Sequence, residues 1–190
     1  MFVRTGALLA CAALSCTGLA LAQTSPAPSA SPAAAATPLT GPSPAPAITK
    51  AITDDYALTC KGTLDPTDDN LTKIFALLAP EYVNVDTKGT QTKRDEVIAT
   101  AKQQLKTFHG TDCSNNFDAM VAPDANTVIV INNGNVVGDV QAPDGKHDID
   151  VTTKTQDTWK LENGSWLQTE SKDLHVTFKV DGNVMQDTGN

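Results

Sequence analysis

The stretch DIDVTTKTQDTWKLENGSW, residues 148–166, alternates like a β-strand and then reaches an Asn-Gly turn. One parity of this stretch carries Ile149, Val151, Asp157, Trp159 and Leu161. Because successive side chains of a strand point to opposite faces, we expect the Asp157 carboxylate on the face of the apolar residues. An acid that faces a cavity usually has a partner or a task. The alternative is a strand bulge that turns Asp157 outward.

Around this stretch, helical patterns come early in the chain and strand patterns come late. Apolar spacing predicts helices over 48–62, from about 66 to 80 and over 92–110, with stops at Gly62, Pro80 and Gly110. Strands are predicted over 82–86, 116–122, 127–132, 136–141, 148–161 and 166–180, with tight turns at Asn133-Gly134 and Asn163-Gly164. Consecutive hairpins predict an antiparallel sheet. We therefore expect an α+β domain with about three N-terminal helices packed on one face of a curved sheet.

The N-terminus has the pattern of a cleavable signal peptide over residues 1–22. Arg4 precedes a short apolar run, which ends in a small-x-small site before Gln23. The run is too short and too interrupted for a membrane span, and Cys16 is a poor match to a lipoprotein site. Residues 23–47 are rich in Pro, Ala and Ser and carry no charge, which predicts an extended tether. Residues 48–190 suit one domain of a secreted or periplasmic protein.

The charge balance argues against polyanionic partners. The chain has 14 basic and 22 acidic residues and a formal net charge of −8 at pH 7. Loss of a leader that contains Arg4 makes the charge one unit more negative. Such a chain repels phosphate backbones, so we expect neither nucleic acid nor an anionic membrane surface as a partner.

Two cysteines, Cys60 and Cys113, remain after the predicted leader. Disulfides persist in exported proteins, so a bridge between them is expected, and two buried free thiols are the alternative. The spacing of His, Cys, Asp and Glu indicates no metal site, and no glycine loop or nucleophile motif indicates a cofactor.

Two longer motifs carry a family resemblance. The succession LLAPEYVNVDTKGTQTKRDEV (77–97), followed by hairpins and then by TQDTWKLENGSWLQTES (155–171), resembles the nuclear transport factor 2-like superfamily. The similarity is to its SnoaL-like, ketosteroid-isomerase-like branch and covers most of residues 48–180. The resemblance implies a cone of curved sheet and three helices, with a pocket at the wide end. It also implies a homodimer, formed through the sheet.

The same resemblance implies roles for two aspartates. Asp86 matches the position of the general base in the steroid isomerase branch, and Asp157 matches the position of a protonated acid in its oxyanion hole. Such a pair suits proton transfer next to a carbonyl group. Tyr56 is the one candidate on the first helix for the tyrosine of that branch. Its distance in sequence from Asp86 is longer than the family pattern.

Plainer interpretations of these residues stay open. Asp86 precedes a glycine turn, where an aspartate often accepts hydrogen bonds from backbone N–H groups. Tyr82 and Asn84 share the strand parity of Asp86, and Trp159 either packs in the core or stacks on a ligand.

The sequence thus favours a binding domain for a small, largely apolar molecule, with Tyr56, Tyr82, Asn84 and Trp159 as ligand-binding residues. An enzymatic version would use Asp86 as base and Asp157 as acid. A non-catalytic interaction domain displayed on the tether is the alternative.

Overall fold

The structure is a computed structural model that describes residues 39–189. The predicted signal peptide and residues 23–38 of the predicted tether lie outside the described residues. The elements in chain order are α1 (Pro46–Leu64), α2 (Asp68–Phe75), β1 (Leu78–Val85), β2 (Gln91–Lys93), α3 (Arg94–Gln104), β3 (Phe108–Asp124), β4 (Thr127–Ala142), β5 (Gly145–Glu162), β6 (Ser165–Val180) and β7 (Asn183–Gly189).

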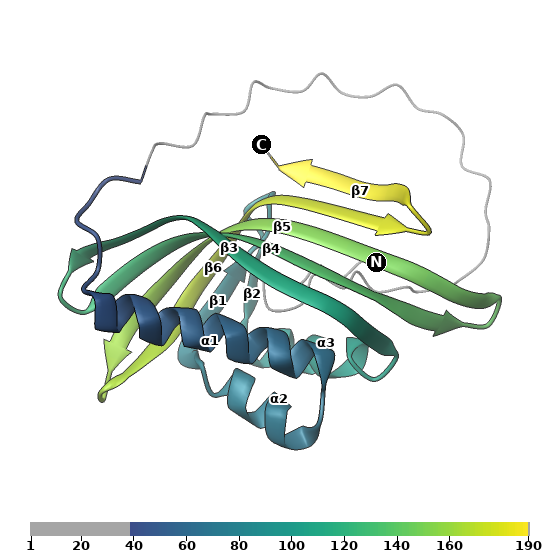
Figure 1. Cartoon of the computed structure of the whole chain (residues 1–190), viewed down its shortest axis with the longest axis horizontal. Helices are drawn as coiled ribbons and strands as arrows, with labels where there is room; N and C mark the ends of the chain where they lie inside the picture. Colours follow the sequence, from purple (N-terminus) through teal and green to yellow (C-terminus); the bar gives the residue numbers. More distant parts are fainter. Residues whose placement is uncertain (1–38, 190) are drawn as a thin grey trace.

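The strands form one curved seven-stranded sheet in the order β2-β1-β6-β5-β4-β3, and β7 also pairs with β6. Only β1 and β6 run parallel among the described strands, and the other pairs are antiparallel. The three helices gather on one face of this sheet, and α1 lies along β3 (Figure 1). The predicted α+β architecture of helices on a curved sheet is confirmed.

The first helix is longer than predicted at both ends. It begins at Pro46, which occupies the first turn without losing a hydrogen bond, so residues 46–47 of the predicted tether are helical. It also continues past Gly62 to Leu64. A Cβ atom at Gly62 would lie 2.9 Å from the Ile74 side chain. The glycine therefore allows α2 to approach α1 and does not end the helix.

The second helix is shorter than predicted because its expected C-terminal part belongs to the sheet. Thr67 caps α2 by accepting a hydrogen bond from the Asn70 N–H at 3.3 Å. The helix ends at Phe75, and β1 begins at Leu78, four residues before the predicted strand. Pro80 lies within β1.

The third helix also differs from its predicted boundaries. Thr92 and Asp95 form no capping box at the predicted start of this helix, since Lys93 is the N-cap and makes no side-chain cap. Thr92 instead lies in β2, a strand that the sequence pattern did not predict. The helix ends at Gln104, and Phe108 and Gly110 belong to β3.

The hairpin turn predicted at Asn133-Gly134 is wrong. Both residues lie inside β4, which continues to Ala142. A Cβ atom at Gly134 would lie 3.0 Å from Thr153 Oγ1 and 3.6 Å from Asn115 Oδ1. The glycine therefore makes room for polar side chains on the neighbouring strands.

The turn predicted at Asn163-Gly164 is confirmed. These residues have φ values of 51° and 83°, the left-handed conformation that a two-residue hairpin turn requires. Asp181 and Gly182, with φ values of 50° and 77°, make an equivalent turn between β6 and β7. The sequence pattern predicted neither this turn nor β7.

Two apolar clusters lie between the helices and the sheet. The larger one joins α2, α3 and β1 to one half of the sheet; its largest fully buried members are Ile74, Tyr82, Val97, Phe108 and Val151. The smaller one joins α1 to the other half through Ile52, Tyr56, Val128, Val130 and Trp159. Polar side chains lie between the two clusters, and these form the candidate site.

Candidate functional site

Asp157 is the centre of the candidate site. Its side chain is only 1 % exposed, and it points to the helix-covered face of the sheet together with its β5 neighbours Thr155 and Trp159. The outward orientation that a bulge would have produced is therefore not found. Val130 of β4 and Ser171 of β6 lie opposite Asp157 on either side.

Three hydroxyl groups from three elements surround the Asp157 carboxyl group. Ser171 on β6 donates a hydrogen bond to Oδ1 at 2.6 Å. Tyr56 on α1 and Thr155 on β5 both donate to Oδ2, Thr155 at 3.0 Å. Hydroxyl groups can donate or accept, so this arrangement satisfies the carboxyl group in both its ionised and its neutral form.

The environment of Asp157 alters its acidity. Burial raises the pKa of the Asp157 carboxyl above its ordinary value of 3.8, and the hydrogen bonds from Ser171, Tyr56 and Thr155 act in the opposite direction. Burial and the nearby Asp157 charge also raise the pKa of Tyr56 and of Tyr82 well above 10.0. Both phenols therefore remain neutral hydrogen-bond donors.

Strand β1 extends this polar site across the sheet. Asn84 lies beside Ser171 in the parallel β1–β6 pair, and Tyr82 and Asn84 are each 1 % exposed. Within residues 39–189, neither amide atom of Asn84 has a hydrogen-bond partner. The Tyr82 hydroxyl lies near Ser171 but also lacks a hydrogen bond of normal geometry to any described residue.

We call Tyr56, Asp157, Ser171, Tyr82 and Asn84 the polar row. It runs from α1 across β5 and β6 to β1. Four of the predicted site residues, Tyr56, Tyr82, Asn84 and Asp157, belong to it, so the structure brings together residues that lie far apart in sequence.

Trp159 borders the polar row on its apolar side. The Trp159 side chain is 2 % exposed, and its ring centroid lies 5.6 Å from that of Tyr56; the Phe117 ring centroid lies 5.0 Å from that of Tyr56. The Trp159 indole N–H lies near the Tyr56 hydroxyl but makes no hydrogen bond of normal geometry to any described residue. This geometry makes Trp159 a core residue, and ligand contact by its ring stays a prediction.

Asp86 lies in the turn after β1, two residues beyond Asn84. Its Oδ1 atom accepts hydrogen bonds from the backbone N–H groups of Lys88 at 2.8 Å and Thr90 at 2.9 Å. The side chain is 8 % exposed. These contacts fit the turn-stabilising interpretation, and the role of Asp86 as a general base stays a prediction.

The sequence pattern missed several polar residues of the interior. Gln168, Ser171 and Asp173 of β6 are all buried, although they do not share one parity. The β5–β6 register shifts twice, between Lys154 and Thr155 and between Thr158 and Trp159, and these bulges change which β6 side chains face inward. A strict alternation of two therefore could not identify them.

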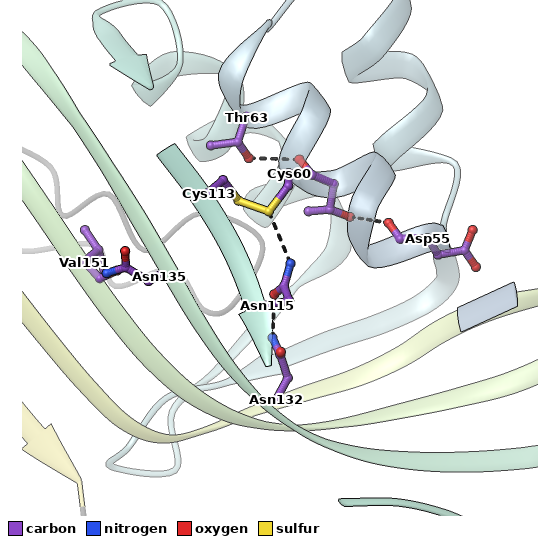
Figure 2. Close-up of a disulfide and its surroundings, with 9 residues drawn as sticks. Asp55, Cys60, Thr63, Cys113, Asn115, Asn132, Asn135 and Val151 are labelled. Atoms are coloured by element: carbon purple, nitrogen blue, oxygen red, sulfur yellow. Dashed lines mark hydrogen bonds between the residues drawn. A yellow bond between two sulfur atoms is a disulfide. The ribbon is translucent and has the colours of Figure 1, made fainter. Parts of the chain in front are cut away.

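The predicted bridge between Cys60 and Cys113 is present and joins α1 to β3. The Cα atoms are 5.4 Å apart (Figure 2). Such a disulfide is compatible with an extracellular or periplasmic protein. Beside it, a cleft of about 610 Å³ runs between α1 and β3. Its lining includes Thr53, Tyr56, Ala57, Leu64, Asn115 and Phe117 in addition to the two cysteines.

Over residues 39–189, no group of three or more His, Cys, Asp and Glu side chains is arranged to hold a metal ion. In the same part of the chain, no helix is both long and apolar enough to span a membrane.

Comparison with known proteins places this geometry in a known fold. No family model matches the sequence, and no curated protein matches it either. A solved structure of a protein from Planctomyces limnophilus superposes with a TM-score of 0.60 at 13 % identity, covering 70 % of this chain and 98 % of that one. A nuclear transport factor 2-like protein from Cytophaga hutchinsonii gives 0.52 at 16 %, covering 66 % and 95 %. The chain has the nuclear transport factor 2-like fold.

A further structure of this fold is a hexachlorocyclohexane dehydrochlorinase, LinA type 2. It superposes with a TM-score of 0.56 at 14 % identity and covers 75 % of this chain and 88 % of that one. The nuclear transport factor 2-like fold thus includes an enzyme that acts on a small molecule. At this identity the likeness concerns the fold, so the chemistry of this chain has to be argued from its own residues.

Proposed function

We propose that this protein is an exported small-molecule-binding domain, whose cone-shaped interior recognises a carbonyl or hydroxyl group on an otherwise apolar molecule. The polar row would bind that group, and apolar side chains beside the row would surround the rest of the molecule. The predicted leader, the Pro/Ala/Ser-rich segment after it and the disulfide support export.

The observation that carries this proposal is the buried, unpaired amide of Asn84. A buried polar group without a hydrogen bond costs about 1–3 kcal/mol of stability. Within the described residues, both amide atoms of Asn84 are buried and have no hydrogen-bond partner. The Tyr82 hydroxyl is also buried and makes no hydrogen bond of normal geometry to any described residue. A ligand that pairs with these groups would recover this cost and would explain why an apolar side chain does not occupy the position.

Asp157 supports a catalytic version of the same proposal. A carboxyl group that burial keeps neutral can donate a hydrogen bond to a developing enolate. The raised pKa of Asp157 and the neutral Tyr56 donor beside it suit that task. The version requires a base, for which Asp86 is the candidate; Asp86→Asn would then abolish turnover and leave binding largely intact. Equal turnover in this variant would contradict catalysis by Asp86.

An exposed apolar strand favours the alternative, a non-catalytic interaction domain. On β7, Val184 is 58 % and Met185 is 64 % exposed. Edge strands with apolar side chains can pair with another chain. Light scattering of the full protein and of a Val184→Thr/Met185→Thr variant tests the interaction-domain alternative together with the predicted homodimer.

The binding proposal is tested with a matched pair of probes, acetylnaphthalene and ethylnaphthalene, which differ by a carbonyl group. We expect the wild type to bind the ketone about tenfold more tightly, a difference of about 1.4 kcal/mol. The Asn84→Leu variant should lose this preference. It should also unfold at higher urea concentration, because an apolar side chain replaces an unpaired amide.

The control is Asn116→Leu, which changes an exposed asparagine of β3. This variant should keep the preference for the ketone. Failure of the wild type to prefer the ketone, or an unchanged preference in Asn84→Leu, would contradict the proposed function.

A further inference from the structure

The cleft between α1 and β3 has Tyr56, a member of the polar row, in its wall. One face of α1 lines it with Thr53, Tyr56, Ala57, Cys60 and Leu64, which follow one another at helical spacing. The opposite wall is residues 113–117 of β3. Its volume of about 610 Å³ is within the range of about 300–1,000 Å³ that holds small molecules.

The walls of the cleft are mainly apolar, and polar and charged groups come from Thr53, Lys61, Asp65, Ser114 and Asn115. Phe117, Leu64 and the disulfide give apolar surface, and Asn115 gives an oriented amide. The Asn115 Nδ2 atom donates to Cys60 Sγ at 3.2 Å, and its Oδ1 atom accepts from Asn132 Nδ2 at 2.9 Å (Figure 2). Small-molecule sites typically combine apolar walls with a small number of oriented polar groups.

One direct hydrogen bond and one series of neighbouring polar residues lie between the cleft and Asp157. Tyr56 lies in the cleft wall and donates to Asp157 directly. The series runs from Asn115 to Asn132, which lies opposite Thr155 in the β4–β5 pair, and Thr155 donates to Asp157. Asn132 is 5 % exposed, and its Oδ1 atom has no partner among residues 39–189. A buried acceptor is therefore left unpaired next to the cleft.

We infer that this cleft is the site where the apolar body of the ligand lies, with Tyr56 as the boundary between the cleft and the polar row. This inference rests on the proposed function and deepens it by assigning a ligand class: a compact aromatic or alicyclic molecule with a single carbonyl or hydroxyl group. The apolar body contacts Phe117 and the disulfide, and the polar group points past Tyr56 into the polar row.

The disulfide is part of this site because Cys60 and Cys113 belong to opposite walls of the cleft. Their bond holds α1 and β3 at a fixed separation beside the bound molecule. Ligand affinity should therefore depend on the bridge, whereas the Asp157 hydrogen bonds, which lie deeper in the domain, should not.

The test is a cleft-filling variant, Ala57→Trp, measured by the emission of acetylnaphthalene on binding. Ala57 is exposed on α1 and lines the cleft, so an indole ring there occupies the space of the ligand. We expect affinity for both naphthalene probes to fall at least tenfold. The matched control is Asp54→Trp, which places the same ring on the part of α1 that does not line the cleft, and it should bind as the wild type does.

A second variant, Cys60→Ala/Cys113→Ala, removes the bridge across the cleft. Once circular dichroism has confirmed that it is folded, we expect weaker binding of both probes and a retained preference for the ketone. The two proposals fail separately. Wild-type affinity in Ala57→Trp would contradict the assignment of the cleft as a binding site, but it would not affect the role of the polar row. If Asn84→Leu kept the preference for the ketone, the role of the polar row would be contradicted, but the assignment of the cleft as a binding site would not be affected.

Discussion

Two aspartates of this domain show opposite responses to their surroundings. Asp157 lies in the interior, where burial raises its pKa although three hydroxyl groups donate to it. Asp181 lies in the turn between β6 and β7, where the hydrogen bond with His147 lowers its pKa. His147 contacts Asp181 at 2.8 Å and Asp144 at 3.2 Å. The same residue type is thus an ordinary surface anion in one region and a candidate functional acid in the other, and desolvation makes the difference.

Truncation of the two kinds of carboxylate should have very different effects on stability. Asp157→Ala leaves the buried hydroxyls of Tyr56, Ser171 and Thr155 without their acceptor, so the free energy of unfolding should fall by about 3 kcal/mol. Asp144→Ala, on the exposed β4–β5 turn, is the control and should cause a much smaller change. Urea denaturation of both variants makes the measurement. Equal losses would remove the distinction between the two regions.

Loss of a single hydroxyl group at Tyr56 should have an intermediate effect. Tyr56→Phe keeps the ring contacts with Phe117 and Trp159 but removes one donor to Asp157. We expect a loss of about 1 kcal/mol in unfolding free energy and a further rise of the Asp157 pKa, because a donor to the carboxylate is gone. Denaturation and an NMR titration of the variant test both effects. A lower Asp157 pKa in Tyr56→Phe would contradict the assigned hydrogen bond.

The two regions should also differ in the sign of their pH dependence. Because the folded-state pKa of Asp157 is raised, its contribution to stability is complete below the unfolded value of about 3.8 and is lost as pH rises through the folded pKa. Asp181 has a lowered pKa, so its contribution is present above about 3.8 and is lost as pH falls through the folded value. Stability measured against pH for wild type, Asp157→Asn and Asp181→Asn separates these terms. Parallel curves for the two variants would refute the assignment.

The smallest expected effect concerns His147. Hydrogen bonds to Asp181 and Asp144 raise its pKa above 6.5, so its stabilising contacts are complete below that value and are lost as pH rises through the folded pKa. In His147→Asn, amide exchange in β7 should become faster at low pH, with little change in global unfolding. Unchanged β7 exchange at every pH would show that the histidine does not hold this hairpin.

The sequence predicted the sheet better than its connections. The alternation around Asp157 correctly placed this residue on the apolar face, because β5 is regular through that stretch. Asn163-Gly164 was recognised because both residues need positive φ values. Asn133-Gly134 was not a turn, since the glycine there serves close packing against Thr153. Such a contact depends on the neighbouring strand and leaves no local pattern.

The candidate site was predictable only in part for a similar reason. Parity and family resemblance pointed to Tyr82, Asn84 and Asp157. The register shift between β5 and β6 concealed Ser171, although it donates directly to the Asp157 carboxyl group. The α1–β3 cleft could not be predicted either, because it depends on how closely the disulfide holds a helix to an edge strand.

The most direct test of the account is one carbon-13 NMR titration of the side-chain carboxyl groups in the wild-type protein. It observes Asp157 and Asp181 in the same sample. We expect Asp157 to titrate above the ordinary value of 3.8 and Asp181 to titrate below it. If the two groups titrated together, or in the reverse order, Asp157 would be an ordinary solvated carboxylate, and the polar row would lose its central member.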